Sequence, residues 1–515
     1  MTMISLDGHT LTAAEVMRVA TGNAQVSISP DAMPRIEAAR SVVERILAND
    51  ETVYGINTGF GALVHQRISS EDLTQLQTNL VRSHATAIGE LMSKEAVRAM
   101  MTVRINSLSK GNSGVHPGVL QQLVDFLNYD IIPAIPRIGS LGASGDLAPL
   151  SHMALSLIGE GDVLTHDGGT EPTLNRLEKH GLIPLELRAK DGLSLINGTS
   201  QMCSFLVLAE QKIADLFVYA DLALCTSIEA RKASVKPSDE RVHHARPHPG
   251  QVLVSQRVRT ILKDSPIIAS HSDCEQVQDA YSFRCAPQVH GAIYERLTSL
   301  QKTLDIELNS ATDNPLIFPD ISNPGPHEVI SQGNFHGEVL ALSADAMTAA
   351  MFELGSISER RIDQMLDPAR SGLPAFLAKD SGLESGLMIV QYVAGASLGE
   401  LHGHAAPRSI FSTSTSAGQE DHVSMGATAC WNLLQATDRL SEVLACEFIV
   451  ACQALEFNEI QPSKFIVAMK QRIRSVVEPL EGDRSTSADI IAVAKELLDS
   501  KWLAMVEAEV GRLPR

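Results

Sequence analysis

Aromatic residues and paired cysteines are scarce in this 515-residue sequence. Phe, Trp and Tyr make up only 4% of the chain, although 44% of its residues are hydrophobic. Aromatic and β-branched side chains favour strands, whereas Ala and Leu favour helices, so this composition favours a helical protein. The seven cysteines include no CxxC pair, so we expect neither a disulfide framework nor a metal site built on cysteine.

Basic charge and long apolar runs are also lacking. The chain has 42 Lys and Arg against 61 Asp and Glu, a net charge of −19. Such an acidic surface repels nucleic acid phosphates and anionic lipids, so we expect a small-molecule partner and neither nucleic acid nor membrane. The start, MTMISLDGHT, has no basic segment followed by an apolar core. The longest uncharged apolar stretch, near residues 386–399, is shorter than the ~20 residues that span a bilayer. We therefore expect a cytoplasmic protein.

Glycine and proline divide the chain into two regions. They interrupt the N-terminal part, for example in YGINTGFGAL at 54–63 and GNSGVHPG at 111–118. Residues 199–236 contain neither, and the run 338–367 contains only one glycine. We predict an all-α protein with an irregular, glycine-rich domain at 1–198 and a bundle of long helices at 199–515.

Apolar residues in the second region recur at helical spacing. One stripe runs along 338–367 and another along 427–460. Their members are Val339, Leu342, Ala346, Ala350, Leu354 and Ile357 in the first run, and Leu433, Leu440, Leu444 and Leu455 in the second. The polar stretches 232–250 and 319–334 are expected to be loops.

The N-terminal region also holds an unusual cluster of small residues, Ala143-Ser144-Gly145-Asp146, within RIGSLGASGDLAPL. A nucleophile elbow would need G-x-S-x-G after a strand, and the last glycine is missing here. An ordinary alternative is a loop in which Ser144 or Asp146 caps the next helix.

A third alternative is a ring formed from the backbone. The amide nitrogen of Gly145, which no side chain obstructs, would attack the carbonyl carbon of Ala143. Dehydration of Ser144 would then leave an exocyclic methylene. The product would be an electrophile, a chemistry that none of the twenty side chains supplies strongly.

These residues and several further blocks resemble the aromatic amino acid ammonia-lyases, which form a methylidene-imidazolone (MIO) from Ala-Ser-Gly. The blocks span almost the whole chain in the order of the family. They are VYGINTGFGAL at 53–63, NLVRSHA at 79–85, GSLGASGDLAPLSHMAL at 139–155, LINGTSQM at 195–202, VQDAYSFRCAPQVHG at 277–291, TDNPLIF at 312–318, QGNFHGE at 332–338 and GQEDHVSMG at 418–426.

The resemblance implies a fold, an assembly and a cofactor. The fold would be an all-α, fumarase/aspartase-like bundle of long helices beside an MIO-bearing domain. The assembly would be a homotetramer whose active sites draw residues from more than one subunit. The cofactor would be MIO, built from Ala143, Ser144 and Gly145, with no metal and no diffusible cofactor.

The resemblance also implies catalytic residues. Tyr54 would be the base that takes the β-proton, although an unperturbed phenol titrates only at about 10. Asn197 would face the MIO carbonyl oxygen, where negative charge develops; alone, it would be a helix N-cap. Tyr281 would orient the substrate and the ring.

Further residues would bind substrate. Arg284 would clamp the carboxylate with its planar guanidinium, although an arginine considered alone is usually a surface residue. Gly61 would shape the glycine-rich loop that carries Tyr54. Gln278 would assist in orientation, and Phe335 would pack against the MIO ring.

His84 and Glu420 indicate the substrate. Together they would cradle an imidazole, with Glu420 accepting from one ring N–H and His84 engaging the other nitrogen. In phenylalanine and tyrosine lyases an amide occupies the place of Glu420, so GQEDHVSMG resembles the histidine ammonia-lyase version. We therefore expect conversion of L-histidine to urocanate and ammonia.

One segment departs from the family pattern. Histidine lyases commonly carry S-E-N-K before the Q-E-D block, but residues 397–411 read SLGELHGHAAPRSIF, without the lysine. A metal interpretation of His402 and His404 lacks a further ligand. A lyase or aminomutase acting on tyrosine, phenylalanine or a modified histidine remains an alternative. So does a non-catalytic helical scaffold.

Overall fold

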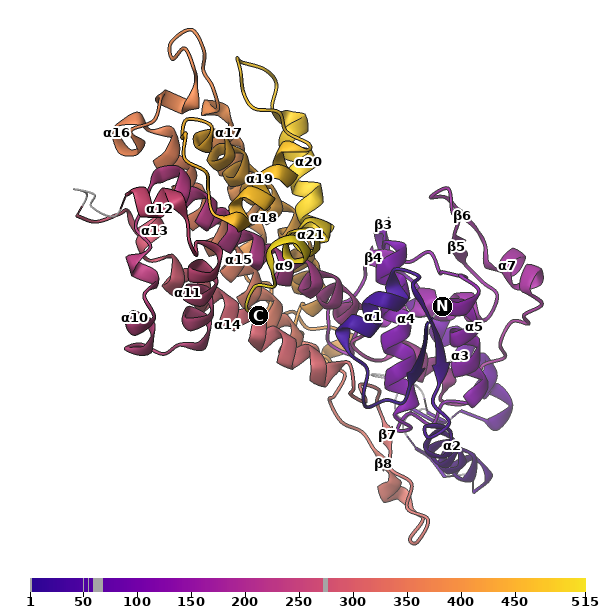
Figure 1. The fold of residues 1–515 in the computed structure, drawn as a ribbon. Helices are drawn as coiled ribbons and strands as arrows, with labels where there is room; N and C mark the ends of the chain where they lie inside the picture. The colour runs from indigo at the N-terminus through magenta and orange to yellow at the C-terminus, as the bar shows by residue number, and fades with distance from the viewer. Residues whose placement is uncertain (1, 50, 54, 59–67, 272–276) are drawn as a thin grey trace. The chain divides into compact units, whose positions relative to one another are not determined.

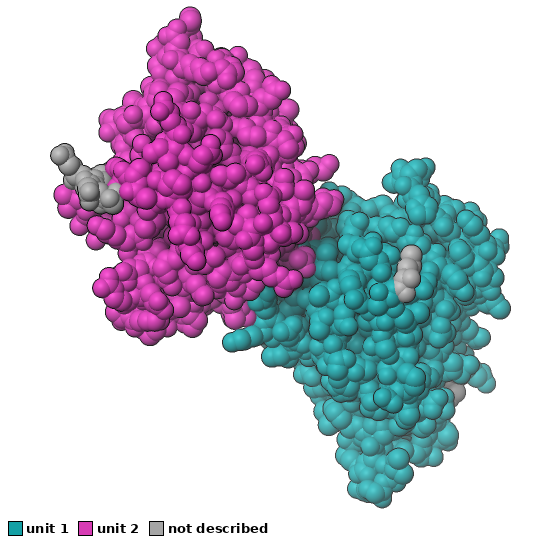
Figure 2. All heavy atoms as spheres, viewed as in Figure 1, with its two compact units in different colours: residues 1–208, 301–345, 407–431 teal, residues 209–300, 346–406, 432–515 magenta. Residues whose placement is uncertain are grey.

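Helices dominate the computed structural model, which describes all residues except 1, 50, 54, 59–67 and 272–276 (Figure 1). The chain divides into two compact units (Figure 2). Unit 1 comprises residues 1–208, 301–345 and 407–431, and unit 2 comprises 209–300, 346–406 and 432–515. The expected all-α class with long helices is confirmed. The division at residues 198 and 199 stays a prediction.

Unit 1 combines short helices with short pairs of strands. Its helices include α1 Ala13–Ala20, α2 Met33–Ala48, α3 Leu73–His84, α4 Lys94–Ser109, α5 Pro117–Asn128, α6 Leu147–Leu157, α7 Thr173–His180 and α8 Asp191–Ile196. Single 3-10 turns lie at Ser70–Asp72, Pro326–Glu328 and Ser416–Gly418.

The described strands of unit 1 form four two-stranded sheets. β1 Thr2–Leu6 pairs in parallel with β2 Ala24–Ile28. The other pairs are antiparallel. They are β3 Ile88–Leu91 with β4 Pro136–Ile138, β5 Asp162–Leu164 with β6 Thr170–Pro172, and β7 Leu316–Ile317 with β8 Val329–Ile330.

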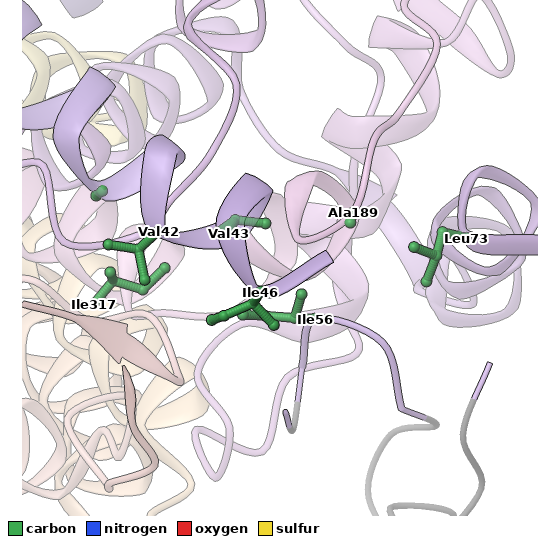
Figure 3. Close-up of a cluster of buried hydrophobic side chains, with 8 residues drawn as sticks. Val42, Val43, Ile46, Ile56, Leu73, Ala189 and Ile317 are labelled. Atoms are coloured by element: carbon green, nitrogen blue, oxygen red, sulfur yellow. The ribbon is translucent and has the colours of Figure 1, made fainter. Parts of the chain in front are cut away.

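A hydrophobic cluster joins sequence-distant parts of unit 1 (Figure 3). Helix α2 contributes Val42, Val43 and Ile46, and Ile56 and Ile317 lie against them. All five side chains are at most 3% exposed. Because burying one such side chain stabilises the fold by about 1.5–3 kcal/mol, the cluster fixes Ile56 and the strand β7 to α2.

Four long helices follow the runs that contain little glycine or proline. They are α9 Ser200–Arg231, α14 Ala286–Glu307, α15 Glu338–Leu366 and α18 Gly426–Leu455. In α18 the stripe is buried as expected, with Leu433, Leu440 and Leu444 fully inaccessible.

The stripe expected in α15 is only partly correct. Leu354 is buried, but Val339 and Leu342 are 51% and 54% exposed. The buried face of α15 is the adjacent one, which includes Leu340 and Ala344. Helix α15 is also the one described helix whose length and composition would suit a membrane span. In the 18-residue stretch of α15 that meets this criterion, 61% is buried, as in a core helix.

The remaining helices belong to unit 2. They are α10 Glu240–His244, α11 Pro249–Ile261, α12 Pro266–Ser270, α13 Tyr281–Arg284, α16 Pro368–Ser371, α17 Met388–Ala405, α19 Lys464–Arg474, α20 Ser487–Leu498 and α21 Lys501–Val510, with 3-10 turns at Lys236–Ser238 and Ala375–Leu377.

The two expected loops are not wholly irregular. Helix α10 and one 3-10 turn lie within 232–250, and β8 and another turn lie within 319–334. Elements this short carry too few apolar residues to show a period, so the sequence pattern missed them.

Candidate active site

The loop that contains Ala-Ser-Gly is held by backbone contacts from distant segments of unit 1. The N–H of Met425 donates to the Leu141 carbonyl at 2.8 Å. The Gly142 carbonyl accepts from the Gly337 N–H and the Ser424 hydroxyl, both at 2.9 Å. Gly142 adopts φ +65°, a left-handed conformation that suits glycine. These bonds give the loop one defined path.

Gly145 lies directly against the backbone of Gly198. The two residues form a parallel bridge, and the Asp146 N–H donates to the Gly198 carbonyl at 2.7 Å. A Cβ on Gly145 would lie 2.1 Å from that carbonyl oxygen. With φ +76° as well, position 145 admits only glycine without displacement of the backbone. Its small neighbour Ala143 is 5% exposed.

The carboxyl group of Asp146 caps a helix, but not the next one in sequence. Asp146 precedes α6, yet its side chain makes no capping bond there. It accepts instead from the backbone N–H groups of Gln201 and Met202, at 2.8 and 3.1 Å, in the first turn of α9. The Ser140 hydroxyl donates to its other oxygen at 2.8 Å. Burial raises the pKa of Asp146 to about 7, against the lowering effect of these donors.

Ser144 contacts Glu420, one of the two residues expected to recognise substrate. The Ser144 hydroxyl donates to Oε1 of Glu420 at 2.8 Å, across 276 residues of sequence. The hydroxyl of Thr415 donates to Oε2 at 3.1 Å, so both carboxylate oxygens are engaged. Ser144 and Glu420 are both half-buried. The structure thus places the carboxylate beside the serine of Ala-Ser-Gly.

His84 lies at the C-terminal end of α3, within the influence of the same carboxylate. Its Nδ1 lies 2.9 Å from the Leu80 carbonyl oxygen and 3.0 Å from the Ser83 hydroxyl. Because a carbonyl only accepts, Nδ1 carries the proton and Nε2 of the neutral ring is left as an acceptor. Burial lowers the pKa of His84, and the Leu80 carbonyl and the charge of Glu420 oppose that shift.

Asn197 is buried next to the loop, at the end of α8 rather than at the start of α9. It is the C-cap residue of α8 and is 5% exposed, so the N-cap interpretation is wrong. Its carbonyl accepts from Nη1 of Arg104 at 2.6 Å. Its side-chain Oδ1 is buried and finds no partner among the described residues. A buried amide oxygen of this kind calls for a hydrogen-bond donor.

Phe335 is half-buried in the segment between β8 and α15. Two residues later, Gly337 bonds to the Gly142 carbonyl, so this segment is attached to the Ala-Ser-Gly loop. Its neighbour His336 stacks on His422, with ring centroids 5.8 Å apart and an interplanar angle of 3°.

The other three expected residues lie together in unit 2. Nη1 of Arg284 donates to Oε1 of Gln278 at 2.5 Å. The Arg284 guanidinium lies 5.9 Å from the ring centroid of Tyr281. All three line a pocket of about 730 Å³ that also includes Lys236. Tyr281 is 72% exposed, so its ring is available to a ligand or to another chain.

Some expectations lie outside the described residues or find no support. Tyr54 and Gly61 lie outside the described residues. Among the residues that are described, no group of three or more His, Cys, Asp or Glu side chains could hold a metal ion. His402 packs edge-on against Phe352, with centroids 5.2 Å apart.

The comparison with known proteins decides the family. The model of the aromatic amino acid lyase family matches residues 11–475. The chain belongs to this family. A curated relative from Myxococcus xanthus, named histidine ammonia-lyase, is 44% identical over 506 residues, which cover 98% of both chains.

Two solved structures agree with this membership. Histidine ammonia-lyase from Trypanosoma cruzi has a TM-score of 0.91 and 38% identity, and the match covers 99% of this chain and 96% of that one. Tyrosine aminomutase from Streptomyces globisporus has a TM-score of 0.93 and 36% identity, with 100% of both chains covered. The family and the enzyme class expected from the motifs are confirmed.

Three residues near the loop of this aromatic amino acid lyase were not singled out from sequence. Gly198 and Ser424 stand inside quoted family blocks, and their small size was a usable signal. Arg104 stands in the ordinary helix α4, and nothing in its spacing or neighbours distinguishes it from a surface arginine. Only the fold brings it to Asn197.

Proposed function

We propose that this chain eliminates ammonia from L-histidine to give urocanate. The observation that carries the proposal is the carboxylate of Glu420 at hydrogen-bond distance from Ser144, with His84 under its electrostatic influence. A protonated imidazole ring carries two N–H donors. The carboxylate of Glu420 and the unprotonated Nε2 of His84 are two acceptors suited to hold them. The relatives named histidine ammonia-lyase support the same substrate.

We infer that Ala143, Ser144 and Gly145 condense into MIO. The bond forms between the Gly145 nitrogen and the Ala143 carbonyl carbon. The carbonyl oxygen leaves as water with the amide hydrogens of Ser144 and Gly145. A second water takes the Ser144 hydroxyl and its Cα hydrogen. The surroundings fit this group at position 145, where there is no room for a Cβ.

The group would supply an electrophilic carbon that makes the substrate amine a better leaving group. The chain's own residues would do the rest. Tyr54 would take the β-proton. Its phenol would act at neutral pH only if neighbouring charge or hydrogen bonds lowered its pKa from about 10.

Binding would orient the substrate at both ends. Arg284 would hold the carboxylate through two parallel N–H donors, with Gln278 and Tyr281 fixing its direction. Glu420 would accept one N–H of the protonated imidazole ring, and the unprotonated Nε2 of His84 would accept the other. Phe335 and Gly61 would shape the walls. Holding both ends removes the rotational freedom that elimination would otherwise have to overcome.

We further propose a homotetramer in the cytoplasm whose sites combine residues of different copies. Gln278, Tyr281 and Arg284 would then complete the site of another subunit. Exposure of Tyr281 in the single chain supports this. Light scattering of the purified enzyme would give four times the 55.4 kDa chain mass, and a monomer that is fully active would contradict it.

A second candidate, an aminomutase or a lyase for another aromatic or modified amino acid, rests on two observations. One is the tyrosine aminomutase match over the whole chain, and the other is the absence of the S-E-N-K lysine. A substrate panel of L-histidine, an N-methylated histidine, L-tyrosine and L-phenylalanine, with NMR identification of products, separates them. Urocanate alone supports the proposal. A β-amino acid, or product only from another substrate, overturns it.

A further inference from the structure

A buried arginine lies beneath the Ala-Ser-Gly loop with most of its donors unused. Arg104, on α4, is fully inaccessible to solvent. Its Nη1 donates to the Asn197 carbonyl at 2.6 Å. Its Nε and Nη2 have no hydrogen-bond partner among the described residues. Buried donors without acceptors destabilise the folded state, so an apolar side chain would fill this core position at lower free energy than Arg104 does.

The acidic groups near Arg104 are occupied elsewhere. Asp313 accepts from Nζ of Lys190 at 2.5 Å and from the Ser194 hydroxyl at 3.0 Å. Asp146 accepts from Ser140 and from α9. Burial lowers the pKa of Arg104 to about 10, which leaves the guanidinium charged at neutral pH. Within the described part of the chain, its hydrogen bonding is therefore directed at the peptide that follows Asn197.

That peptide is tightly enclosed between Arg104 and the loop. A Cβ on Gly198 would lie 2.4 Å from Nη1 of Arg104 and 2.6 Å from Oγ1 of Thr312. On the loop side, the Gly198 carbonyl accepts from the Asp146 N–H, and a Cβ on Gly145 would strike it. The contacts therefore run from Arg104, through the Asn197–Gly198 peptide, to Gly145.

We propose that Arg104 is a positioning residue for ring closure: it fixes the Asn197–Gly198 peptide, against which Gly145 is held in the conformation that lets its nitrogen reach the Ala143 carbonyl. The inference deepens the proposed function and rests on MIO formation. Ring closure requires the reacting atoms to approach to about 3–3.5 Å, and a misplacement of about 1 Å can slow a reaction roughly a hundredfold. A charged donor holds the Asn197 carbonyl more firmly than a neutral one.

The test compares three variants with the wild-type chain. Arg104→Met removes the donors and the charge. Arg104→Lys keeps the charge but loses the planar fork. Arg98→Met is the matched control. Arg98 lies on the same helix and is 5% exposed, and its donors reach the carbonyls of Val19 and Leu127, away from the loop.

The readout is the intact mass of each chain at fixed times after cell-free synthesis, with the thermal midpoint measured alongside. We expect the wild-type chain and Arg98→Met to lose the mass of two waters at the same rate. Arg104→Met would lose it roughly tenfold to a hundredfold more slowly, and Arg104→Lys would be intermediate. For chains that have lost both waters, the KM for L-histidine would be near the wild-type value in all variants.

The outcomes separate the inference from the proposed function. If the wild-type chain loses no water, the proposed function fails. If it does, and both Arg104 variants mature at the wild-type rate, the positioning role is overturned. If Arg104→Met does not fold, Arg104→Lys decides: slower maturation supports the role, and the wild-type rate overturns it. If Arg98→Met also loses the two waters slowly, the slowing reflects general instability of the fold, and the positioning role is likewise overturned.

Discussion

The hydroxyl of Ser144 and the carboxylate of Glu420 meet at 2.8 Å although 276 residues separate them. Ser144 belongs to the cluster of small residues that would become the electrophile, and Glu420 belongs to the block that distinguishes an imidazole substrate from a phenyl one. A substrate whose ring is held by Glu420 is therefore held beside the Ala-Ser-Gly loop. The contact lies within unit 1.

Replacement of the Glu420 carboxylate is expected to weaken imidazole binding. Glu420→Gln keeps the size of the side chain but removes its charge. A hydrogen bond to a charged group contributes about 1.5–3 kcal/mol, so kcat/KM for L-histidine should fall roughly tenfold to a hundredfold. Steady-state kinetics measure this. Glu178→Gln, at an exposed position of α7, is the control. Equal kcat/KM for the wild type and Glu420→Gln would remove Glu420 from recognition.

A methyl group on Gly145 is expected to block the loss of two waters that forms MIO. Gly145→Ala places Cβ 2.1 Å from the Gly198 carbonyl oxygen. Gly168→Ala is a matched control, since Gly168 has φ +84° but no described atom within 4 Å of the place where its methyl group would lie. The control should lose only about 1–2 kcal/mol from the left-handed conformation. Intact mass should show two waters lost by the control and not by Gly145→Ala. Full water loss by Gly145→Ala would show that the contact with Gly198 is dispensable.

Breaking the buried ion pair between Lys190 and Asp313 is expected to destabilise unit 1. Both side chains are at most 1% exposed, and Lys190 also donates to the Ser194 hydroxyl at 3.1 Å. Lys190→Met leaves a buried carboxylate without its cation, at a cost of about 3–5 kcal/mol. The double variant Lys190→Met/Asp313→Asn should recover much of this loss, because neither member of the pair is then charged. Thermal midpoints measure both variants. A double variant less stable than Lys190→Met would refute this account.

The buried carboxyl group of Glu229 is expected to make unit 2 less stable as pH rises. Glu229 accepts from the Ser463 N–H at 2.8 Å and from the Ser265 hydroxyl. Burial raises its pKa from 4.5 to about 7. The folded state therefore holds this proton more tightly than the unfolded state does. Its contribution, on the order of 3 kcal/mol, is complete below about pH 4.5 and is lost as pH rises through 7.

Glu229→Gln tests this dependence, because an amide stays neutral at every pH. The thermal midpoint of the variant should change less between pH 5 and 7.5 than that of the wild type. Other groups titrate equally in both proteins, so the difference isolates Glu229. Parallel pH curves for the two proteins would contradict the raised pKa.

The sequence predicted the long helices well because each is a long run with little glycine or proline. It misplaced the buried face of α15 because Val339 and Leu340 are both apolar, and periodicity alone does not choose between adjacent faces. The alternative in which Asp146 caps the next helix is also wrong. A side chain just before a helix is normally its cap, yet this carboxyl group reaches α9, more than fifty residues later.

The site residues were predicted through a family resemblance, not through geometry. Ser144, His84 and Glu420 stand in separate blocks, and only folding brings Glu420 close enough to act on the pKa of His84. Arg104 was missed because its function depends on burial against one carbonyl oxygen, and no sequence period encodes such a contact. The roles of Tyr54 and Gly61 stay predictions.

The most direct test of the central claim measures urocanate formation from L-histidine by its ultraviolet absorbance, with Ser144→Ala as the control and the intact mass of both proteins. We predict urocanate and the loss of two waters in the wild type, and neither in Ser144→Ala. Urocanate production by Ser144→Ala at the wild-type rate would contradict the account. So would a wild-type chain that has lost two waters but leaves L-histidine unchanged.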